Sequence, residues 1–309
     1  MHRAFRALCL LCLGGAAVPL AADNALSLVV TTGPEALVSA SHSIDFPAGR
    51  GTDPLTAGNG VSLSLSETLT PLSLEIGAEA VVTPIAFMQL RAGASAATGW
   101  SLGDRRGLAL VRRLGEGSVI SSDLSFAAAV LSVRGGAVLR VELPVGSGGN
   151  RLQAASANDI LYRSLPGADE GDYWVYQSDG GGNRDGWRYA GSHAIQYRMG
   201  VAGRGLELLG LAFEAGVGLD RSPGGEAWGE DLWTMALGAF GEYRLSARTS
   251  LVAFARIASE LAYAKGGDEP YYGDRLVDRR LPYRPGAAKA GLVLRVSLDP
   301  ASPSEEGTL

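Results

Sequence analysis

The segment from residue 206 to residue 220, LELLGLAFEAGVGLD, alternates between two kinds of side chain. Its odd positions carry Leu209, Leu211, Phe213, Ala215, Val217 and Leu219, whereas its even positions from 210 onward carry glycine, alanine, Glu214 and Asp220. A period of two is typical of a β-strand, because successive side chains of a strand point to opposite faces. One face of this strand is therefore apolar, and the other is small and acidic.

The same alternation recurs along the chain. Beside residues 206–220, we expect strands at 24–32, 36–46, 59–69, 72–83, 85–98, 107–114, 121–133, 136–146, 187–201, 233–246, 249–264 and 287–298, with an ambiguous region at 156–178. Closed barrels of the outer membrane have even numbers of strands, so about ten to fourteen are expected, with twelve as the central value.

Two architectures could cover the apolar faces: a soluble β-sandwich or a barrel in a bilayer. The polar faces here are rich in glycine, alanine and paired Glu and Arg, which suits a narrow enclosed lumen better than the surface of a sandwich. Mean hydropathy is positive at +0.11, yet no run of about 18 apolar residues follows residue 22. The sequence therefore predicts an all-β protein: a closed antiparallel transmembrane β-barrel of the bacterial outer membrane, with lipid on its apolar face.

The lengths of the connections support this prediction. Those near residues 69–71, 134–136, 201–205 and 246–248 are expected to be short, and those near 146–187, 220–232 and 265–286 long and polar. Short periplasmic turns alternating with long extracellular loops are typical of such barrels. Aromatic residues near the expected strand ends, where an interfacial girdle would lie, are Trp100, Tyr173, Trp174, Tyr189, Trp233, Tyr243 and Tyr263.

The two ends of the chain are expected to lie outside the barrel. Residues 1–22 have the charged, apolar and small-residue regions of a signal peptide, and residues 299–309 have the composition of a disordered tail, which leaves 23–298 for the barrel. Both cysteines, Cys9 and Cys12, fall in the signal, so no disulfide or zinc–thiolate site is expected. Without the signal the net charge is roughly −7, which does not favour nucleic acid as a partner.

Charged residues on the polar faces are the first candidate site. The expected lumen network comprises Arg140, Glu142, Glu214, Glu242, Arg244, Arg256, Glu260, Lys289 and Arg295. These groups could form ion pairs that plug a narrow lumen, or they could line a small channel of mixed selectivity. No metal or cofactor is expected, because EF-hand spacing, Walker loops, Rossmann glycines and nucleophile elbows are all missing from the sequence.

Over nearly its whole mature length the chain resembles bacterial outer-membrane β-barrel proteins. The segment AGLVLRVSL (290–298) is similar to the closing strand of such barrels, although it ends in Leu298 where many end in an aromatic residue. The resemblance implies a monomer in contact with outer-membrane lipid and with the barrel assembly machinery, with lipopolysaccharide as a further candidate partner. The function it implies is that of a non-enzymatic surface or pore-type barrel.

A fainter resemblance, over about residues 145–300, is to the omptin proteases. It is carried by VGSGGN (145–150) and GGDEPYYGDR (266–275), and it implies an endopeptidase in which an Asp–His dyad activates water. Asp172, His193 and Asp268 are the positions that match this site. Omptins have one residue between a serine and a histidine in this part of the site, whereas Ser192 directly precedes His193. In a later loop they have Asp-x-His, and here Pro270 stands where that histidine should be, so the dyad is degenerate. Parity places His193 on the outward face with Ile195, near the rim.

Overall fold

The computed structural model describes residues 22–32, 36–113, 119–146, 148–169, 172–177, 183–200, 203–220, 229, 231–262, 277, 279–286 and 288–298. Twelve strands form the barrel: β1 (Ala22–Thr31), β2 (Ala36–Pro47), β3 (Gly60–Leu69), β4 (Ser73–Ile85), β5 (Met88–Gly99), β8 (Val130–Pro144), β9 (Arg151–Ser164), β11 (Gly186–Arg198), β12 (Gly205–Gly218), β13 (Thr234–Arg244), β14 (Thr249–Leu261) and β16 (Lys289–Ser297). Neighbouring strands pair antiparallel throughout.

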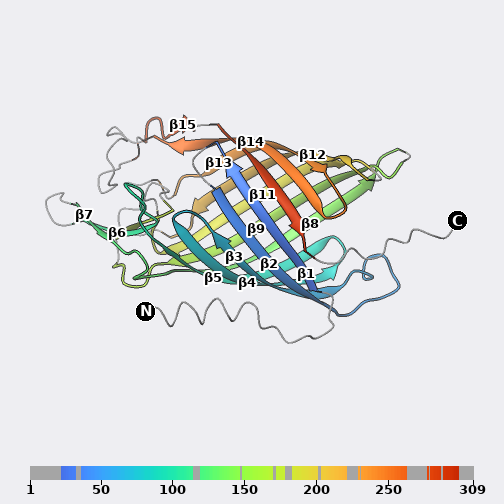
Figure 1. The fold of residues 1–309 in the computed structure, drawn as a ribbon, viewed down its shortest axis with the longest axis horizontal. Coiled ribbons are helices and arrows are strands. Elements are labelled where there is room, and N and C mark those ends of the chain that lie inside the picture. Colours follow the sequence, from blue (N-terminus) through green and yellow to red (C-terminus); the bar gives the residue numbers. More distant parts are fainter. Residues whose placement is uncertain are drawn as a thin grey trace.

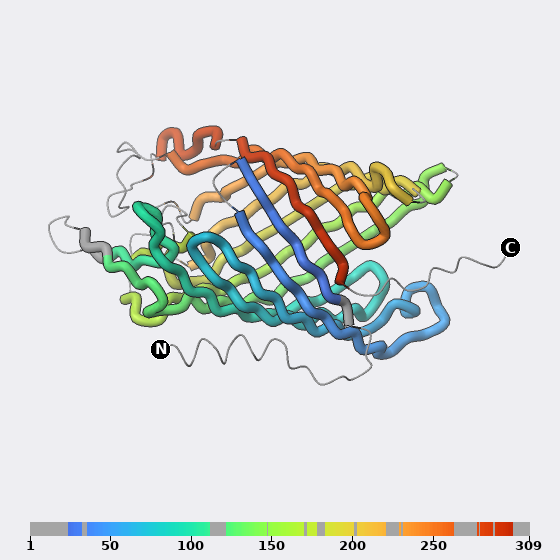
Figure 2. The backbone as a smooth tube through the Cα atoms, viewed as in Figure 1, coloured from blue at the N-terminus to red at the C-terminus, as the bar shows by residue number. Residues whose placement is uncertain are grey.

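Pairing of the first strand with the last closes the cylinder. Strand β1 pairs with β16 over seven residue pairs, from Ala25 opposite Ser297 to Thr31 opposite Gly291, and Figure 2 shows the two running side by side. Because β13 also pairs with β14, the described sheet has no break between neighbouring barrel strands. A closed antiparallel barrel and a count of twelve are thus confirmed.

The connections separate the barrel into two distinct ends. Strand β1 begins and β16 ends at one of them, here called the terminal end, where the connections span 48–59, 86–87, 145–150, 199–204 and 245–248. At the opposite or capped end lie the connections 100–129, 165–185, 219–233 and 262–288, together with the short ones 32–35 and 70–72 (Figure 1). The four longest connections are therefore all at the capped end.

Three expectations about the connections were wrong. Residues 134–136 are not a turn, because β8 runs unbroken through them. Residues 146–187 are not one loop, because β9 crosses the barrel between them, and the turn at 70–72 lies at the end that carries the long loops. Residues 107–114 do contain a strand, but it does not belong to the barrel.

That strand belongs to a small sheet, here called the cap, made of β6 (Leu108–Arg113), β7 (Val119–Asp123) and β10 (Tyr173–Tyr176). Trp174 and Leu108 are completely buried in it, and they pack with Ala97 and Val130, which lie on inward positions of β5 and β8. The cap is therefore held against the inner wall at the mouth of the barrel. A further short strand, β15 (Tyr283–Pro285), extends the pairing of β14.

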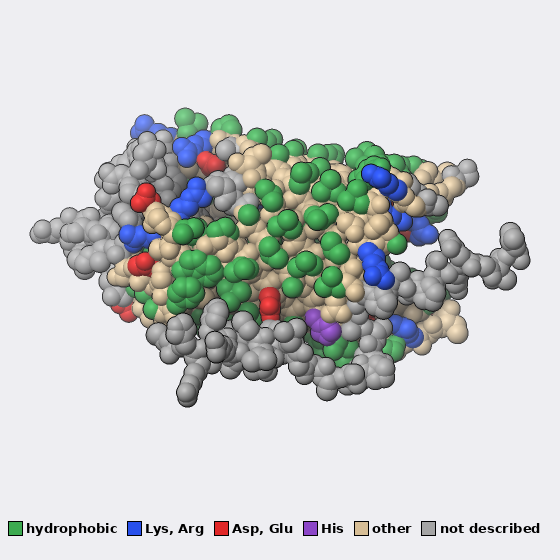
Figure 3. All heavy atoms as spheres, in the orientation of Figure 1, with side chains coloured by type: hydrophobic (Ala, Val, Ile, Leu, Met, Phe, Trp, Pro, Cys, Tyr) green, Lys and Arg blue, Asp and Glu red, His purple; other side chains and the backbone are tan. Residues whose placement is uncertain are grey.

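The outer surface is apolar across its middle. Large side chains there are well exposed, among them Leu65 at 59%, Ile195 at 61% and Leu211 at 60%. Figure 3 shows the hydrophobic side chains spread over the middle of the visible face, with most charged ones toward its two ends. An exposed apolar belt of this kind is what a bilayer solvates. Among the described residues there is no helix long and apolar enough to cross a membrane.

The expected aromatic girdle is only partly present. Tyr173 and Trp174 are buried in the cap, so their assignment to the girdle was wrong. Tyr189 and Trp233 do meet on the outer side near the capped end, with ring centroids 5.6 Å apart in an edge-on arrangement. Tyr263 lies outside the described residues.

Candidate functional site

The barrel lumen gathers the charged side chains that the strand patterns place on their polar faces. All nine residues of the expected network occupy positions with the same parity as residues that line the internal cavities. Several are ion-paired: Arg256 Nη2 is 2.9 Å from Glu214 Oε2, and Arg295 Nη1 is 3.8 Å from Glu242 Oε2.

Three partners of this network are missing from the sequence-based set. Arg244 pairs with Glu207 at 2.6 Å, Glu260 with Arg284 at 3.3 Å, and Glu142 with Arg151. Odd-numbered residues of β12 such as Leu209 and Leu211 face outward, so alternation alone would place Glu207 on the lipid face as well. A bulge between Leu206 and Leu208 shifts the register and turns Glu207 inward.

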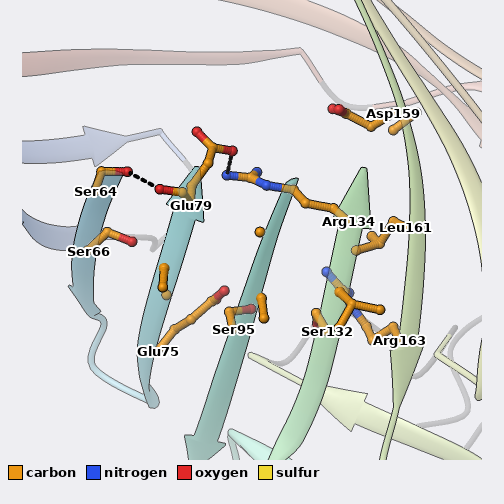
Figure 4. A pocket seen from close by; sticks show the side chains of 16 residues that line it. Ser64, Ser66, Glu75, Glu79, Ser95, Ser132, Arg134, Asp159, Leu161 and Arg163 are labelled. Carbon is orange, nitrogen blue, oxygen red and sulfur yellow. Dashed lines mark hydrogen bonds and ion pairs between the residues drawn. The ribbon is translucent and has the colours of Figure 1, made fainter. Parts of the chain in front are cut away.

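Four further charged residues, here called the ion-pair belt, cross the lumen wall near mid-height: Glu79 on β4, Arg91 on β5, Arg134 on β8 and Asp159 on β9. Arg91 binds Asp159 with two nitrogens, Nε lying 2.7 Å from Oδ1. Arg134 Nη2 lies 2.5 Å from Glu79 Oε2, a pair that Figure 4 shows. The Arg91 and Asp159 side chains are only 23% and 15% exposed. A two-pronged guanidinium–carboxylate contact is among the strongest and most directional of polar contacts.

Each pair of the belt reaches across an intervening strand, and glycine makes this possible. Gly136 on β8 is in register with both Arg91 and Asp159, and Gly93 on β5 lies between Glu79 and Arg134. Adjacent strands are about 4.8 Å apart, so the paired backbones are about 10 Å apart and the side chains must pass over the middle strand. A Cβ at Gly136 would collide with the Asp159 carboxylate and with the carbonyl oxygen of Asn158.

Cavities occupy the lumen on both sides of the belt. A central cavity of about 380 Å³ is lined by Ser64, Ser66, Ser95 and Ser132 with Glu75, Arg134 and Arg163, as Figure 4 shows. It shares Glu79 with a terminal-end cavity of about 460 Å³. It also shares Arg163 with a mouth cavity of about 300 Å³ and Asp159 with a side cavity of about 330 Å³.

The cap narrows the capped end on one side. Gln177 Nε2 donates to Ser73 Oγ at 2.8 Å, and the Tyr176 hydroxyl donates to Glu75 Oε2 at 3.4 Å. Burial raises the pKa of the Tyr176 hydroxyl to about 12, and the negative charge of Glu75 acts in the same direction. The mouth cavity runs beside the cap, between Tyr173 and the walls of β11 and β12.

The structure does not bring together His193 and Asp172, the two described residues of the omptin-like hypothesis. His193 lies at the middle of β11 rather than near the rim, and it faces outward, stacked 6.1 Å from Phe213 with Nδ1 2.9 Å from Ser156 Oγ. Asp172 is buried beside the cap, where its carboxylate accepts from the backbone N–H of Asp169 at 2.8 Å. Asp268 lies outside the described residues.

Metal chemistry has no evident site in the described part of the chain. No group of three or more His, Cys, Asp or Glu side chains is arranged there to hold a metal ion. The chemistry that the lumen offers is instead that of solvated cations, carboxylates and hydroxyls, which can bind or exclude solutes by charge.

Comparisons with known proteins concern the fold. The NanC porin is 6% identical and matches 90% of this chain and 100% of its own, with a TM-score of 0.40. The translocator domain of autotransporter NalP from Neisseria meningitidis is 9% identical, with 96% and 95% covered and a TM-score of 0.39. The beta domain of the Bordetella autotransporter BrkA is 11% identical, with 89% and 97% covered and a TM-score of 0.35.

No family model and no curated protein matches the sequence. Identities this low concern the fold alone, so no shared function follows from them. The chain is an all-β protein folded as a closed antiparallel barrel of twelve strands, an architecture that outer-membrane proteins also adopt.

Proposed function

We propose that this protein is a pore of the bacterial outer membrane through which small polar solutes diffuse. The observation that carries the proposal is the series of cavities that share lining residues from the terminal end, past the ion-pair belt, to the mouth beside the cap. Water occupies about 30 Å³ per molecule in the liquid, so each of these three cavities has room for about ten to fifteen molecules. A lumen plugged by ion pairs alone would not leave such space.

The orientation follows from the two ends. Long loops of bacterial barrels face the outside and short turns face the periplasm. We therefore infer that the capped end is extracellular and the terminal end periplasmic. The apolar belt is then in contact with lipid, with lipopolysaccharide on the outer side. Insertion by the barrel assembly machinery and a monomeric state complete the proposal.

Conductance across a planar lipid bilayer tests the proposed pore. The refolded barrel should give discrete current steps at neutral pH. Ser95→Trp places a large side chain in the central cavity and should reduce the step size severalfold. Ala96→Trp is the matched control, because the neighbouring Ala96 has the opposite parity and is exposed on the outer face, so its step size should equal that of the wild type. Current steps that are absent, or equal in the two variants, would contradict a conducting lumen.

A further inference from the structure

The terminal-end cavity differs from the central one in how its cations are held. It is lined by residues from β2, β3, β4, β5 and β8 and from the connection 48–59, among them Asp45, Arg50, Ser62, Glu79, Thr83, Gln89, Arg91 and Arg140. Two of these charges are already neutralised elsewhere, since Arg91 is bound to Asp159 and Glu79 to Arg134. The remaining charges decide what the cavity attracts.

Arg140 has no ion-pair or side-chain hydrogen-bond partner among the described residues. It lies on an inward position of β8, where its backbone N–H donates to the carbonyl of Phe87 at 2.8 Å. Its side chain is exposed to the water of the lumen. A guanidinium is a permanent cation, so this position carries a positive charge that no carboxylate of the described residues neutralises.

Arg50 brings a second cation to the same cavity. Its Nε donates to the carbonyl oxygen of Asn59 at 3.3 Å, which ties the side chain to the far end of the connection that carries it. This bond leaves the positive charge uncompensated, and no carboxylate lies within ion-pair distance among the described residues. Asp45 is the one remaining carboxylate of the cavity, so the cations exceed the acids by one.

We propose that the terminal-end cavity is a binding site for small anions, carboxylates or phosphates, held between Arg140 and Arg50. Hydroxyl and amide donors of Ser62, Thr83 and Gln89 line the same space, as a ligand with several oxygen acceptors requires. A volume of about 460 Å³ lies in the range of ordinary ligand pockets, between about 300 and 1,000 Å³.

This inference rests on the proposed pore only in taking the anion to be a solute that permeates it. Binding of the anion to the site can be measured independently of conductance. The first measurement is calorimetric titration of the folded barrel in detergent with inorganic phosphate and with acetate. The second is the reversal potential in a gradient of potassium chloride. Arg140→Gln should weaken binding and lower the chloride-to-potassium permeability ratio about threefold, and Asp45→Asn should change both in the opposite direction.

Arg248→Gln is the matched control, because it removes the same charge at the same end of the barrel from an exposed turn residue that lines none of the cavities described above. Its binding of phosphate should equal that of the wild type. Heat-modifiable migration on gels checks that each variant is folded. Binding that depends on Arg140 without any current would overturn the pore and leave the site standing. Equal effects of Arg140→Gln and Arg248→Gln, or no binding at all, would overturn the site even if the barrel conducts.

Discussion

The capped end and the middle of the barrel fill the same cylinder in two different ways. At the capped end a small sheet fills one side of the mouth, and its completely buried Trp174 and Leu108 exclude water. In the middle, the ion-pair belt crosses one wall and leaves cavities around it. Apolar packing seals space, whereas ion pairs that reach across a glycine hold a wall in place without sealing it.

The largest expected effect is on the packed side of this comparison. Trp174→Ala removes the central side chain of the cap, and truncations of this kind cost about 3–5 kcal/mol. The β6 and β10 amides should lose protection from hydrogen exchange, while the barrel itself stays folded. Trp187→Ala is the control, since Trp187 is 44% exposed on the outer face. A cap that keeps its protection in Trp174→Ala would mean that apolar packing does not hold it.

A smaller effect is expected where glycine makes room for the belt. Gly136→Ala introduces a Cβ into the space of the Asp159 carboxylate, and overpacking of this kind costs about 1–3 kcal/mol. Gly135→Ala is a control one residue away, because its Cβ would face outward with no atom closer than 4.0 Å. The free energy of unfolding in urea, measured in lipid vesicles, should separate the two. Equal values would show that the belt tolerates a side chain beneath it.

The coupling within the belt should be about 1–3 kcal/mol. A double-mutant cycle of Arg91→Gln and Asp159→Asn measures it, again from urea unfolding in vesicles. Each single variant leaves one charge without its partner at a position that is largely shielded from water. The double variant should therefore lose less stability than the sum of the losses of the two single variants. Additive effects would mean that water screens this pair as it screens a surface one.

The smallest expected effect is the pH dependence of the contribution that the Tyr176 hydroxyl makes to the stability of the cap. The pKa of Tyr176 is raised from about 10 when unfolded to about 12 in the cap, so its stabilising contribution is complete below pH 10 and is lost as the pH rises through 12. Ultraviolet absorbance of tyrosinate should reveal one late-titrating tyrosine that disappears in Tyr176→Phe. If that variant retains the late titration, the cap does not bury this hydroxyl.

Strand positions were predicted largely correctly because alternation is visible in any single strand. The wrong predictions share a cause: where a residue lies and which way its side chain points depended on its neighbours across the sheet. Gly135 and Gly136 have the composition of a turn, yet Gly136 lies within β8 and makes room for an ion pair. Glu207 has lipid-facing parity until a bulge turns it inward. Residues 108–113 form a strand that pairs with β7 in the same connection and with β10 in another, rather than with the barrel.

By itself, then, the sequence determined that this chain forms strands with one apolar and one polar face, because a period of two is a local property of the backbone. It also determined which charges face inward wherever the alternation is regular. Only the tertiary structure decided which of those charges meet. Arg91 and Asp159 are 68 residues apart and are joined through the register of β5, β8 and β9, a relation that no single strand contains.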